Sequence, residues 1–441
     1  MNILIIGSGG REQAIAWQIG KSPKVKKIYL APGNGGTADL NGISENVSIS
    51  PTDFPALIEF VSEKGIDLTI VGPEQPLELG IVDEFQKHHY AIIGPSKAAA
   101  QLETSKAFAK DAMKRFGIPT AGYALFTTFN EASRFVTEKN KFPIVIKASG
   151  LAAGKGVVIA DSESMALNTL DDFFNKRIFG NATDEVVIEE FLQGEEASVF
   201  ALCDGTDFIL LPDAQDHKRI GEGDTGKNTG GMGAYSPALI ITDEVREKVE
   251  KRIIRPLLDG MRIEGIPYTG FLYVGLMIHE GNPSVVEFNA RLGDPETQVI
   301  LPRLESDFLS LLEASLDGTL CEQAVSISRE SALTVVMVSG GYPDSYQTGK
   351  AISGQCHFEE EECKLDVEGK IIVFHSGTKR EQGKLKTAGG RVLSVTAVSS
   401  SLKQAQKDAY EACSQIYFEG VYYRKDIGYK GVERESLFES K

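Results

Sequence analysis

Paired cysteines, long apolar runs and an excess of positive charge are all missing from this sequence. Its five cysteines are odd in number and scattered along the chain, which excludes a regular zinc site or disulfide framework. No apolar run approaches the roughly 18 residues of a membrane-spanning helix, so we expect no membrane partner. The first residues, Met1 to Ile6, carry neither a basic flank nor a small-residue cleavage site, and we therefore expect a cytoplasmic protein.

Acidic residues outnumber basic ones, and the formal net charge is -16. Such a charge repels nucleic acid in general, so we expect no nucleic-acid partner. A phosphate-bearing ligand would need a site built locally from particular basic residues. The chain has 441 residues. At about 150 residues per domain, this length predicts roughly three domains.

The N-terminal part alternates short apolar runs with turn signals and helical patterns. Residues 2–6 are apolar and precede the segment Gly7-Ser8-Gly9-Gly10-Arg11-Glu12, a pattern that predicts strand, glycine turn and helix. Further strand and helix units begin at residues 66–71 and 91–93. This alternation predicts a doubly wound parallel sheet, which we assign to a domain at residues 1–102.

The glycine turn of this domain fails as a dinucleotide-binding fingerprint. Glu12 stands at the third glycine position and no acid ends the second strand, so NAD is disfavoured. Backbone N–H groups at a helix start still attract anions, which makes Gly9 and Arg11 candidates for binding a small anion. The alternative is a tight turn that binds no ligand.

Two lysines and a second glycine-rich segment follow. Lys106 opens a helix that runs to residue 116, and Lys147 ends an apolar strand. Residues 150–156 (Gly-Leu-Ala-Ala-Gly-Lys-Gly) fail as a P-loop, because the spacing is one residue short and Gly156 replaces the Ser or Thr that holds magnesium. The glycines predict a mobile flap that covers a polyphosphate, or otherwise a flexible surface hairpin.

Carboxylates and a long glycine-rich loop mark the middle of the chain. A strand at residues 185–191 leads into residues 192–196, where carboxylates beside exposed backbone can accept hydrogen bonds from an exocyclic amine or from ribose hydroxyls. Residues 213–219 (Asp-Ala-Gln-Asp-His-Lys-Arg) precede a glycine-rich loop at 221–233. A loop of this length inside a compact domain is usually functional or mobile, although His217 taken alone is more often structural than chemical.

The sequence from Val285 to Glu296 carries the strongest chemical signal. Side chains alternate along a strand, so Glu287, Asn289 and Arg291 share one face while residues 286, 288 and 290 share an apolar face. Carboxylate and carboxamide oxygens are ligands that magnesium accepts beside substrate phosphates. Two further acids follow in the turn at 293–296, and such a cluster is costly unless a cation is bound. The alternative is an ordinary half-exposed strand.

Beyond residue 325 the pattern changes to strands around glycine turns, at residues 333–338, 371–375 and 391–398, followed by a helix at 401–417. We predict a separate, small α+β domain at residues 326–425 with no obvious chemistry of its own. Residues 426–441 are assigned to a tail.

Taken together, these segments resemble the ATP-grasp superfamily and, within it, the phosphoribosylamine–glycine ligases. The resemblance covers nearly the whole chain and is carried by five blocks, at residues 9–12, 150–156, 216–219, 228–235 and 291–296. It implies a multidomain α/β and α+β protein whose central part, residues 103–325, has the ATP-grasp fold with a flap subdomain at about 121–190.

The resemblance also implies roles for individual residues. ATP would be bound by Lys106, Lys147, Gly154, Glu189, Glu190, Leu192 and Glu196. The substrates would be bound by Gly9, Arg11, Asp213, His217, Lys218, Arg219, Asn228, Thr229 and Gly230. Glu287 and Asn289 would hold the metal, and Lys155, Arg291 and Asp294 would be catalytic.

The implied reaction joins glycine to 5-phosphoribosylamine through glycyl phosphate, with ATP as co-substrate and Mg²⁺ or Mn²⁺ as cofactor. The products are glycinamide ribonucleotide, ADP and phosphate, and the enzyme is expected to be a monomer or weak oligomer. Two alternatives remain open. The chain could be another ATP-grasp carboxylate–amine ligase, or a nucleotide-binding regulatory module without turnover.

The glycine turn gives one further expectation. If Arg11 and the turn at 7–12 hold the phosphate of phosphoribosylamine, Arg11→Ala removes a charge-assisted bond. Such a loss costs about 1.5 to 3 kcal/mol, so apparent phosphoribosylamine affinity would fall while ATP affinity stays nearly unchanged.

Overall fold

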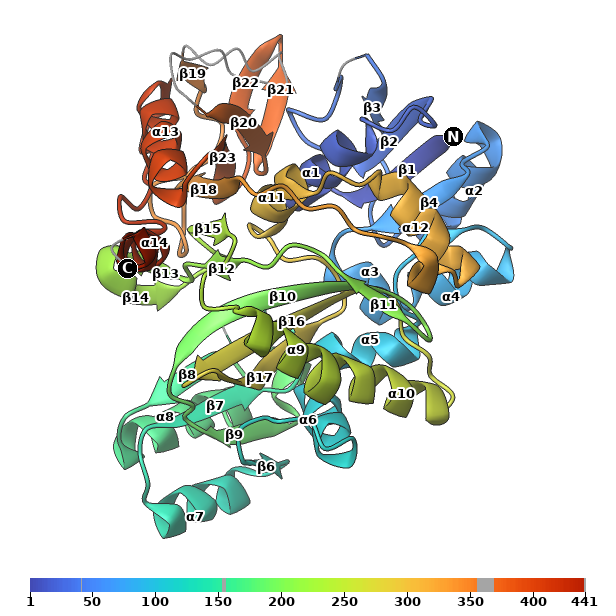
Figure 1. The fold of residues 1–441 in the computed structure, drawn as a ribbon. Helices are drawn as coiled ribbons and strands as arrows, with labels where there is room; N and C mark the ends of the chain where they lie inside the picture. Colours follow the sequence, from blue (N-terminus) through green and yellow to red (C-terminus); the bar gives the residue numbers. More distant parts are fainter. Residues whose placement is uncertain (41, 153–155, 355–368, 440–441) are drawn as a thin grey trace.

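The computed structural model describes residues 1–441 except 41, 153–155, 355–368 and 440–441. It has three parts, visible in Figure 1 as an N-terminal sheet in blue, a central part from cyan to yellow and a C-terminal part in orange and red. The predicted multidomain α/β and α+β architecture is confirmed.

The N-terminal part is a five-stranded sheet in the order β3-β2-β1-β4-β5, and every pair is parallel. This is the doubly wound sheet predicted from the alternating pattern. Its strands are β1 Asn2–Gly7, β2 Lys27–Pro32, β3 Ser44–Asn46, β4 Leu68–Val71 and β5 Ile92–Ile93. Its helices are α1 Gly10–Ile19, α2 Phe54–Lys64, α3 Glu74–Leu79, α4 Ile81–Lys87 and α5 Lys97–Thr104.

The central part contains two four-stranded antiparallel sheets, in the orders β6-β9-β7-β8 and β11-β10-β16-β17. The strands are β6 Tyr123–Phe126, β7 Ile144–Ala148, β8 Val157–Ala160, β9 Val186–Glu190, β10 Glu195–Asp204, β11 Phe208–Leu210, β16 Thr269–His279 and β17 Asn282–Asn289. The helices are α6 Lys106–Arg115, α7 Phe129–Lys139, α8 Glu163–Phe174, α9 Asp243–Val249, α10 Arg255–Ile263, α11 Thr297–Ile300 and α12 Phe308–Asp317.

The C-terminal sheet is antiparallel and takes two of its five strands from the middle of the chain. Its order is β12-β15-β18-β23-β20, where β12 Gln215–Asp216 and β15 Gly233–Ser236 lie more than a hundred residues before most of the others. The segment 213–219 and the loop predicted at 221–233 are therefore partly regular, since they also form the hairpin β13 Arg219–Gly221 and β14 Thr225–Asn228. We propose domain limits at residues 102 and 325. Strands β12 and β15 precede the second limit in sequence but belong to the C-terminal sheet.

The remaining elements complete the C-terminal part. They are β18 Ser331–Val338, β19 Ser353–Gly354, β20 Lys370–His375, β21 Thr378–Glu381, β22 Lys384–Thr387, β23 Arg391–Ser399, α13 Leu402–Ser414, β24 Ile416–Tyr417 and α14 Tyr429–Glu439. Short 3-10 turns occur at Gly180–Thr183, Glu222–Asp224, Leu301–Arg303 and Leu320–Glu322, and a π-helical turn at Glu250–Ile254. The segment assigned to a tail thus contains a helix, which lies beside the β13–β14 hairpin in Figure 1.

One apolar cluster joins the three parts. It includes Ile5 of the N-terminal sheet, Phe200 of the central sheet, Val299 of α11 and Phe374 of the C-terminal sheet. Trp17 of α1 packs edge to face against Phe374, with ring centroids 5.9 Å apart. The relative placement of the parts is therefore fixed by a common core.

His375 lies at the contact between the N-terminal and C-terminal parts. Its backbone N–H donates to Gln13 Oε1 at 2.6 Å, its carbonyl accepts from Asn34 Nδ2 at 2.9 Å, and its ring packs beside Thr378. Burial lowers the pKa of His375 to about 3. The folded protein therefore holds this histidine neutral at pH values at which the unfolded chain protonates it.

We expect acid to weaken this contact. Because the unfolded chain takes up a proton below a pH of about 6.5 and the folded chain does not until about pH 3, stability contributed by neutral His375 is lost as pH falls through that window. Between pH 6.5 and 4.5 the free energy of unfolding should drop by about 2 kcal/mol more in the wild type than in His375→Asn. Urea titrations at several pH values measure this, with the exposed His279→Asn as control. Parallel pH dependence of wild type and His375→Asn would contradict it.

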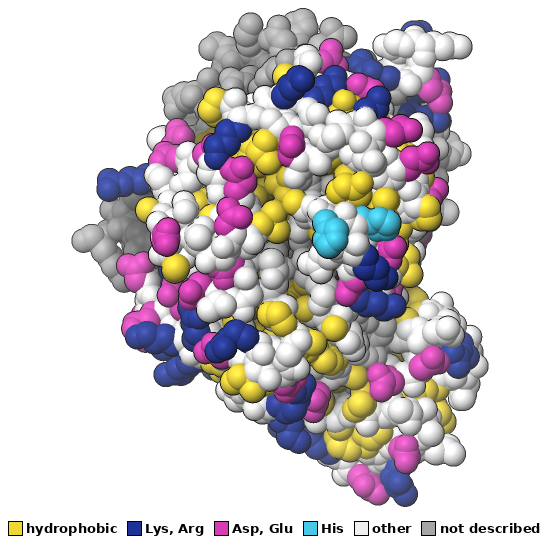
Figure 2. All heavy atoms as spheres, turned by 90° about the vertical axis from the view of Figure 1, so that its right-hand side faces the viewer, with side chains coloured by type: hydrophobic (Ala, Val, Ile, Leu, Met, Phe, Trp, Pro, Cys, Tyr) yellow, Lys and Arg dark blue, Asp and Glu magenta, His cyan; other side chains and the backbone are white. Residues whose placement is uncertain are grey.

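On the face shown in Figure 2, basic and acidic side chains are interspersed among the described residues. None of the described helices has the length and apolar character required to cross a membrane.

Candidate functional site

The predicted metal-ligand strand is β17, and it contains a β-bulge. Glu287 pairs with Gly275 and Val285 pairs with the next residue of β16, so Val286 is an extra residue. The Val286 carbonyl accepts a hydrogen bond from Lys147 Nζ at 3.2 Å. The bulge therefore brings the backbone of β17 to a lysine of the other central sheet.

The alternation predicted for this strand is confirmed after the bulge and wrong at it. Glu287 and Asn289 are half-buried on one face, while Phe288 and Ala290 are buried on the other. Val286 was predicted to share the apolar face, but it is only half-buried because the bulge interrupts the two-residue period.

Glu287 and Asn289 fit a divalent cation. With the Asn289 carboxamide oriented to satisfy its neighbours, its nitrogen donates to Glu103 Oε1 at 3.1 Å and its oxygen is left for a ligand. No hydrogen bond or ion pair recorded within the described part of the chain engages the Glu287 carboxylate. The described residues contain no cluster of three His, Cys, Asp or Glu ligands, so other ligands of a cation here would be phosphate and water oxygens.

Lys147 is part of a buried ion triplet that also contains Glu189 and Lys110. Glu189 Oε1 lies 2.9 Å from Lys147 Nζ, and Glu189 Oε2 lies 3.0 Å from Lys110 Nζ. All three side chains are at most 6% exposed. Burial outweighs the attraction of Glu189 and lowers the pKa of Lys110 to about 8.

Lys110 was not among the predicted site residues, although its position carried a signal. It lies one helical turn after Lys106 on α6, so both lysines point from the same face of the helix. Glu189, expected to bind adenine, has its carboxylate occupied by the two lysines in this structure.

Lys106 lies near the same triplet. Its Nζ is 3.4 Å from the carbonyl oxygen of Gly150, and its pKa is lowered by burial and by the charge of Lys147 against the opposing charge of Glu287. The predicted flap residues Gly154 and Lys155 lie outside the described residues.

The segment between the two central sheets carries the predicted adenine and ribose contacts. Glu190 is exposed and Leu192 is half-buried beside it. Glu196 Oε2 lies 2.9 Å from Lys218 Nζ, and Lys218 lowers the pKa of Glu196. This ion pair joins a predicted ribose ligand to a predicted substrate ligand.

Two residues of the 213–219 segment, Asp213 and His217, have polar partners within the protein. The Asp213 carboxylate accepts from the Ala238 N–H at 2.7 Å and pairs with Arg246 at 2.8 Å. His217 accepts from the Gly428 N–H at 2.9 Å through Nε2 and faces Asp224 through Nδ1. The protein itself uses these groups, and the contact of Asp213 and His217 with substrate stays a prediction.

Asp216 and Lys218, in contrast, lie close to the acids of the site. Burial and the charges of Glu196 and Glu287 raise the pKa of Asp216. Burial alone would lower the pKa of Lys218, but Glu196, Asp216 and Glu287 raise it well above the usual value. Asp216 was missing from the predicted ligands because the sequence around it does not show which side chains of this segment point into the site.

The loop after this segment is held by backbone and side-chain bonds. The backbone N–H and the hydroxyl of Thr229 both donate to the Lys218 carbonyl, at 2.8 and 2.9 Å. The Gly230 N–H donates to Tyr342 at 3.1 Å, and Asn228 pairs with Arg219 in the β13–β14 hairpin. These bonds tie the loop to the backbone of Lys218.

The two acids of the turn at 293–296 have opposite environments. Asp294 lies 3.4 Å from Arg391 and accepts from Gln298 at 2.8 Å. Burial would raise the pKa of Asp294, but Arg391 and Arg11 lower it. Burial and the nearby Asp216 raise the pKa of Glu296 to about 7. Protein arginines thus neutralise Asp294, which corrects the expectation that a bound cation must do so.

Arg291 follows β17 and pairs with two acids of the N-terminal part. Its Nη2 lies 2.8 Å from Glu103, and its Nε lies 3.7 Å from Glu74. Burial would lower the pKa of Arg291, and the charges of Glu103 and Glu74 raise it. An anion at Arg291 would have to compete with these carboxylates.

The N-terminal glycine turn has its donors already occupied. The Gly9 N–H donates to Glu12, the Gly10 N–H donates to Ser376 at 3.1 Å, and Arg11 donates to Glu12 at 2.6 Å and to the Leu292 carbonyl at 3.2 Å. An anion at this helix start would have to compete with the Glu12 carboxylate. The phosphate site at this turn stays a prediction, and Arg11 also links α1 to the turn after β17.

Three domain models of one protein family match successive parts of this chain. Models of the phosphoribosylglycinamide synthetase N domain, ATP-grasp (A) domain and C domain match residues 1–103, 104–297 and 332–430. The chain is 56% identical over 432 residues to a phosphoribosylamine–glycine ligase of Chlorobaculum tepidum, with 98% of this chain and 100% of the relative covered. It is 49% identical to that of Salmonella typhimurium over 437 residues, covering 99% and 100% of the two chains.

Solved structures share the fold of this chain. The crystal structure of a phosphoribosylamine–glycine ligase from Thermotoga maritima is similar with a TM-score of 0.81 and 36% identity, covering 97% of this chain and 100% of that one. A biotin carboxylase from Campylobacter jejuni, at 15% identity, shares the fold with a TM-score of 0.71 and covers 96% of this chain and 93% of its own.

Proposed function

We infer the reaction from family membership, because the chain belongs to the phosphoribosylglycinamide synthetase family: it is a carbon–nitrogen ligase that joins glycine to 5-phosphoribosylamine with ATP. The observation that carries this conclusion is the match to a phosphoribosylamine–glycine ligase over the full length of that relative. The reaction forms glycinamide ribonucleotide in purine biosynthesis and uses a divalent cation.

The chemistry proceeds in two transfers. A carboxylate oxygen of glycine attacks the γ-phosphorus of ATP, the bond to the bridging oxygen breaks, and ADP leaves. The amine nitrogen of phosphoribosylamine then attacks the acyl carbon of glycyl phosphate, phosphate leaves and the amine loses a proton. No covalent bond to the protein is formed, so the residues of the site act by neutralising charge, by positioning and by excluding water.

The proposed roles follow from position. Lys106 and Lys147, together with Gly154 and Lys155, bind the phosphates of ATP. Glu190 and Leu192 contact adenine through their backbone, with Glu189 holding the lysines, and Glu196 binds the ribose once Lys218 releases it.

Lys218, Arg219, Asn228, Thr229 and Gly230 form the substrate side. Support for this assignment comes from Lys218, whose Nζ lies 2.9 Å from the proposed ribose ligand Glu196 and whose pKa is raised, against burial, by Glu196 and Asp216 and also by Glu287. Arg291 and Asp294 shape the site where β17 meets the N-terminal part, because each is held by an ion pair with a residue from another part of the chain.

Glu287 and Asn289 are the proposed cation ligands, and a cation bound there would neutralise charge on the phosphates of ATP. Their oxygens favour magnesium, with manganese as the alternative. The net charge of -16 leads us to propose small-molecule partners without nucleic acid. We further propose a cytoplasmic location and a monomer or weak oligomer.

The test is ADP release from ATP and magnesium with glycine, in the presence and absence of phosphoribosylamine. We expect release to require both substrates and to fall when leucine replaces glycine. Equal rates with leucine would indicate another ATP-grasp ligase, and no release under any condition would indicate a nucleotide-binding module. Replacing magnesium by manganese distinguishes the preferred metal.

A further inference from the structure

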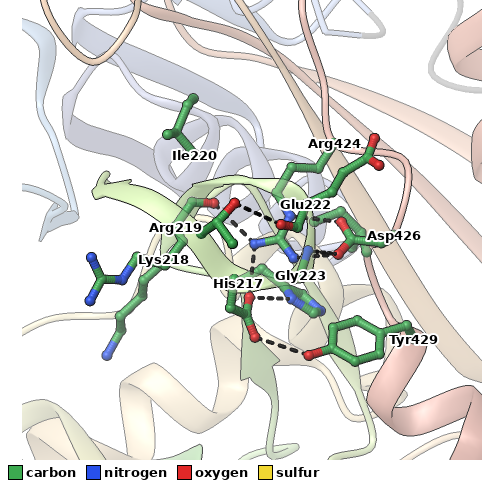
Figure 3. A network of polar contacts seen from close by, with 12 residues as sticks. His217, Lys218, Arg219, Ile220, Glu222, Gly223, Arg424, Asp426 and Tyr429 are labelled. Carbon is green, nitrogen blue, oxygen red and sulfur yellow. Dashed lines mark hydrogen bonds and ion pairs between the residues drawn. The ribbon is translucent and has the colours of Figure 1, made fainter.

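The C-terminal segment at residues 422–434 contacts the neighbours of both partners in the Lys218–Glu196 ion pair. Figure 3 shows this network around the β13–β14 hairpin. On one side of the pair it reaches the residues before and after Lys218, and on the other it reaches the residue before Glu196. None of the residues of this segment was predicted to have a function.

Arg424 is the centre of the network, and its side chain is fully buried with 0% exposed. Its Nη1 donates to the Arg219 carbonyl at 3.0 Å and to Asp224 Oδ1 at 2.9 Å. Its Nε and Nη2 donate to the two oxygens of Asp426 at 2.8 and 2.7 Å, a bidentate pair that fixes the guanidinium plane. Arg424 therefore holds the backbone directly after Lys218.

Asp224 at the tip of the hairpin has a left-handed backbone with φ of 55°. This conformation is uncommon for residues other than glycine and needs support from its surroundings. Besides Arg424, Lys430 and Tyr429 donate to its carboxylate at 2.6 and 3.2 Å. The hydrogen bond from His217 and the bonds from Lys430 and Arg424 hold the pKa of Asp224 well below its usual range.

Two further contacts complete the arrangement. The Gly428 N–H donates to Nε2 of His217, the residue before Lys218, at 2.9 Å. Arg434 of α14 pairs at 2.6 Å with Glu195, the residue before Glu196. One segment of about a dozen residues thus bonds to the neighbours of both members of the ion pair, through the Arg219 carbonyl and through the side chains of His217 and Glu195.

We propose that Arg424 is a positioning residue for the ligase reaction, which acts through the β13–β14 hairpin to place Lys218 at the substrates. The proposal rests on the proposed function, since it takes Lys218 to be a substrate ligand. It assigns to the C-terminal segment a role in turnover, because a misplacement of about 1 Å can cost on the order of 100-fold in rate.

A positioning role differs from general stabilisation in one measurable way. If Arg424 acts through Lys218, removing Arg424 has little further effect once the Lys218 ammonium is gone, because residues that act as a unit are not additive. A residue that only stabilises the fold changes activity by the same factor in both backgrounds.

The experiment is a double-mutant cycle of Arg424→Met and Lys218→Met, read as kcat/KM for glycine in the ADP-release assay. Arg424→Met should lower kcat/KM by about 10- to 100-fold in the wild type and by less than about 3-fold in Lys218→Met. Arg424→Lys keeps the charge without the fork and should recover only part of the loss. Equal factors in both backgrounds would overturn the role.

Arg303→Met is the matched control. Arg303 is also a buried arginine and donates to the carbonyls of Ser328 and Glu330, but it does not touch the hairpin. Its factor should be the same in both backgrounds. If Arg424→Met does not fold, Tyr429→Phe, which removes one bond to Asp224, takes its place in the cycle with the same two outcomes. An inactive wild type would overturn both the proposed function and this role, whereas equal factors in active variants overturn the role alone.

Discussion

Replacing Glu287 by alanine should lower turnover by about 100- to 1,000-fold at saturating ATP and glycine, because the site loses the carboxylate that holds the cation on the phosphates. The fold should not suffer. The Glu287 carboxylate has no hydrogen bond or ion pair recorded among the described residues, and its charge raises the pKa of the nearby Asp216. Removing it relieves repulsion with Asp216 but also removes an attraction for Lys106 and Lys218, so we expect a small net change in stability.

The measurement is kcat over a magnesium titration, with the midpoint of thermal unfolding recorded for the same preparation. Glu280→Asn is the matched control, because Glu280 is an exposed acid at the turn of the same β16–β17 hairpin. Its φ of 48° is one that asparagine also adopts, so this change removes a charge without altering the turn. Unchanged turnover of Glu287→Ala near magnesium saturation would refute the assignment of Glu287 as a metal ligand.

Glu189→Gln should lower the free energy of unfolding by about 3 to 5 kcal/mol at pH 7, since breaking a buried ion pair leaves its partner charge uncompensated. Here two ammonium groups, those of Lys147 and Lys110, are left facing each other without a counter-charge. Denaturant titration measures the loss. A second change, Lys110→Met, should recover part of it, because one of the two buried charges is then gone.

The pH dependence of this loss has a definite sign. The pKa of Lys110 is about 8 in the intact triplet and falls further without the attraction of Glu189. Lys110 is therefore neutral at pH 9 in the variant, and the loss should be smaller at pH 9 than at pH 7. Glu190→Gln is the control, because its carboxylate is exposed and lies 3.9 Å from Lys139, and its effect should stay below about 0.5 kcal/mol. A loss below about 1 kcal/mol for Glu189→Gln would show that water solvates the lysines.

Patterns within one element were predictable from the sequence. The parallel sheet at the N-terminus follows from alternating strands and helices, and the face of β17 follows from the two-residue period. Local exceptions to these patterns were not predictable, because no residue around Val286 signals a bulge. The bulge brings the Val286 carbonyl to Lys147, from which it accepts a hydrogen bond.

Contacts between distant parts explain the remaining differences. Glu103 and Glu74 form ion pairs with Arg291, and Arg391 forms one with Asp294. These partners are separated by roughly a hundred residues or more in the sequence. A sequence shows that Arg291 and Asp294 are charged but not which opposite charge the fold brings to them. For the same reason Asp213 and His217 were grouped with Lys218, while Asp216 was left out.

The origin of the C-terminal sheet bears on how the chain folds during synthesis. Strand β15 ends at Ser236, and its partner β18 begins at Ser331. At about 5 to 20 residues per second, the ribosome needs roughly 5 to 20 s to deliver that partner. Until then β15 lacks its partner β18, so the substrate side of the site cannot be completed before β18 is synthesised. A nascent chain arrested before β18 should therefore expose this edge to proteases and chaperones.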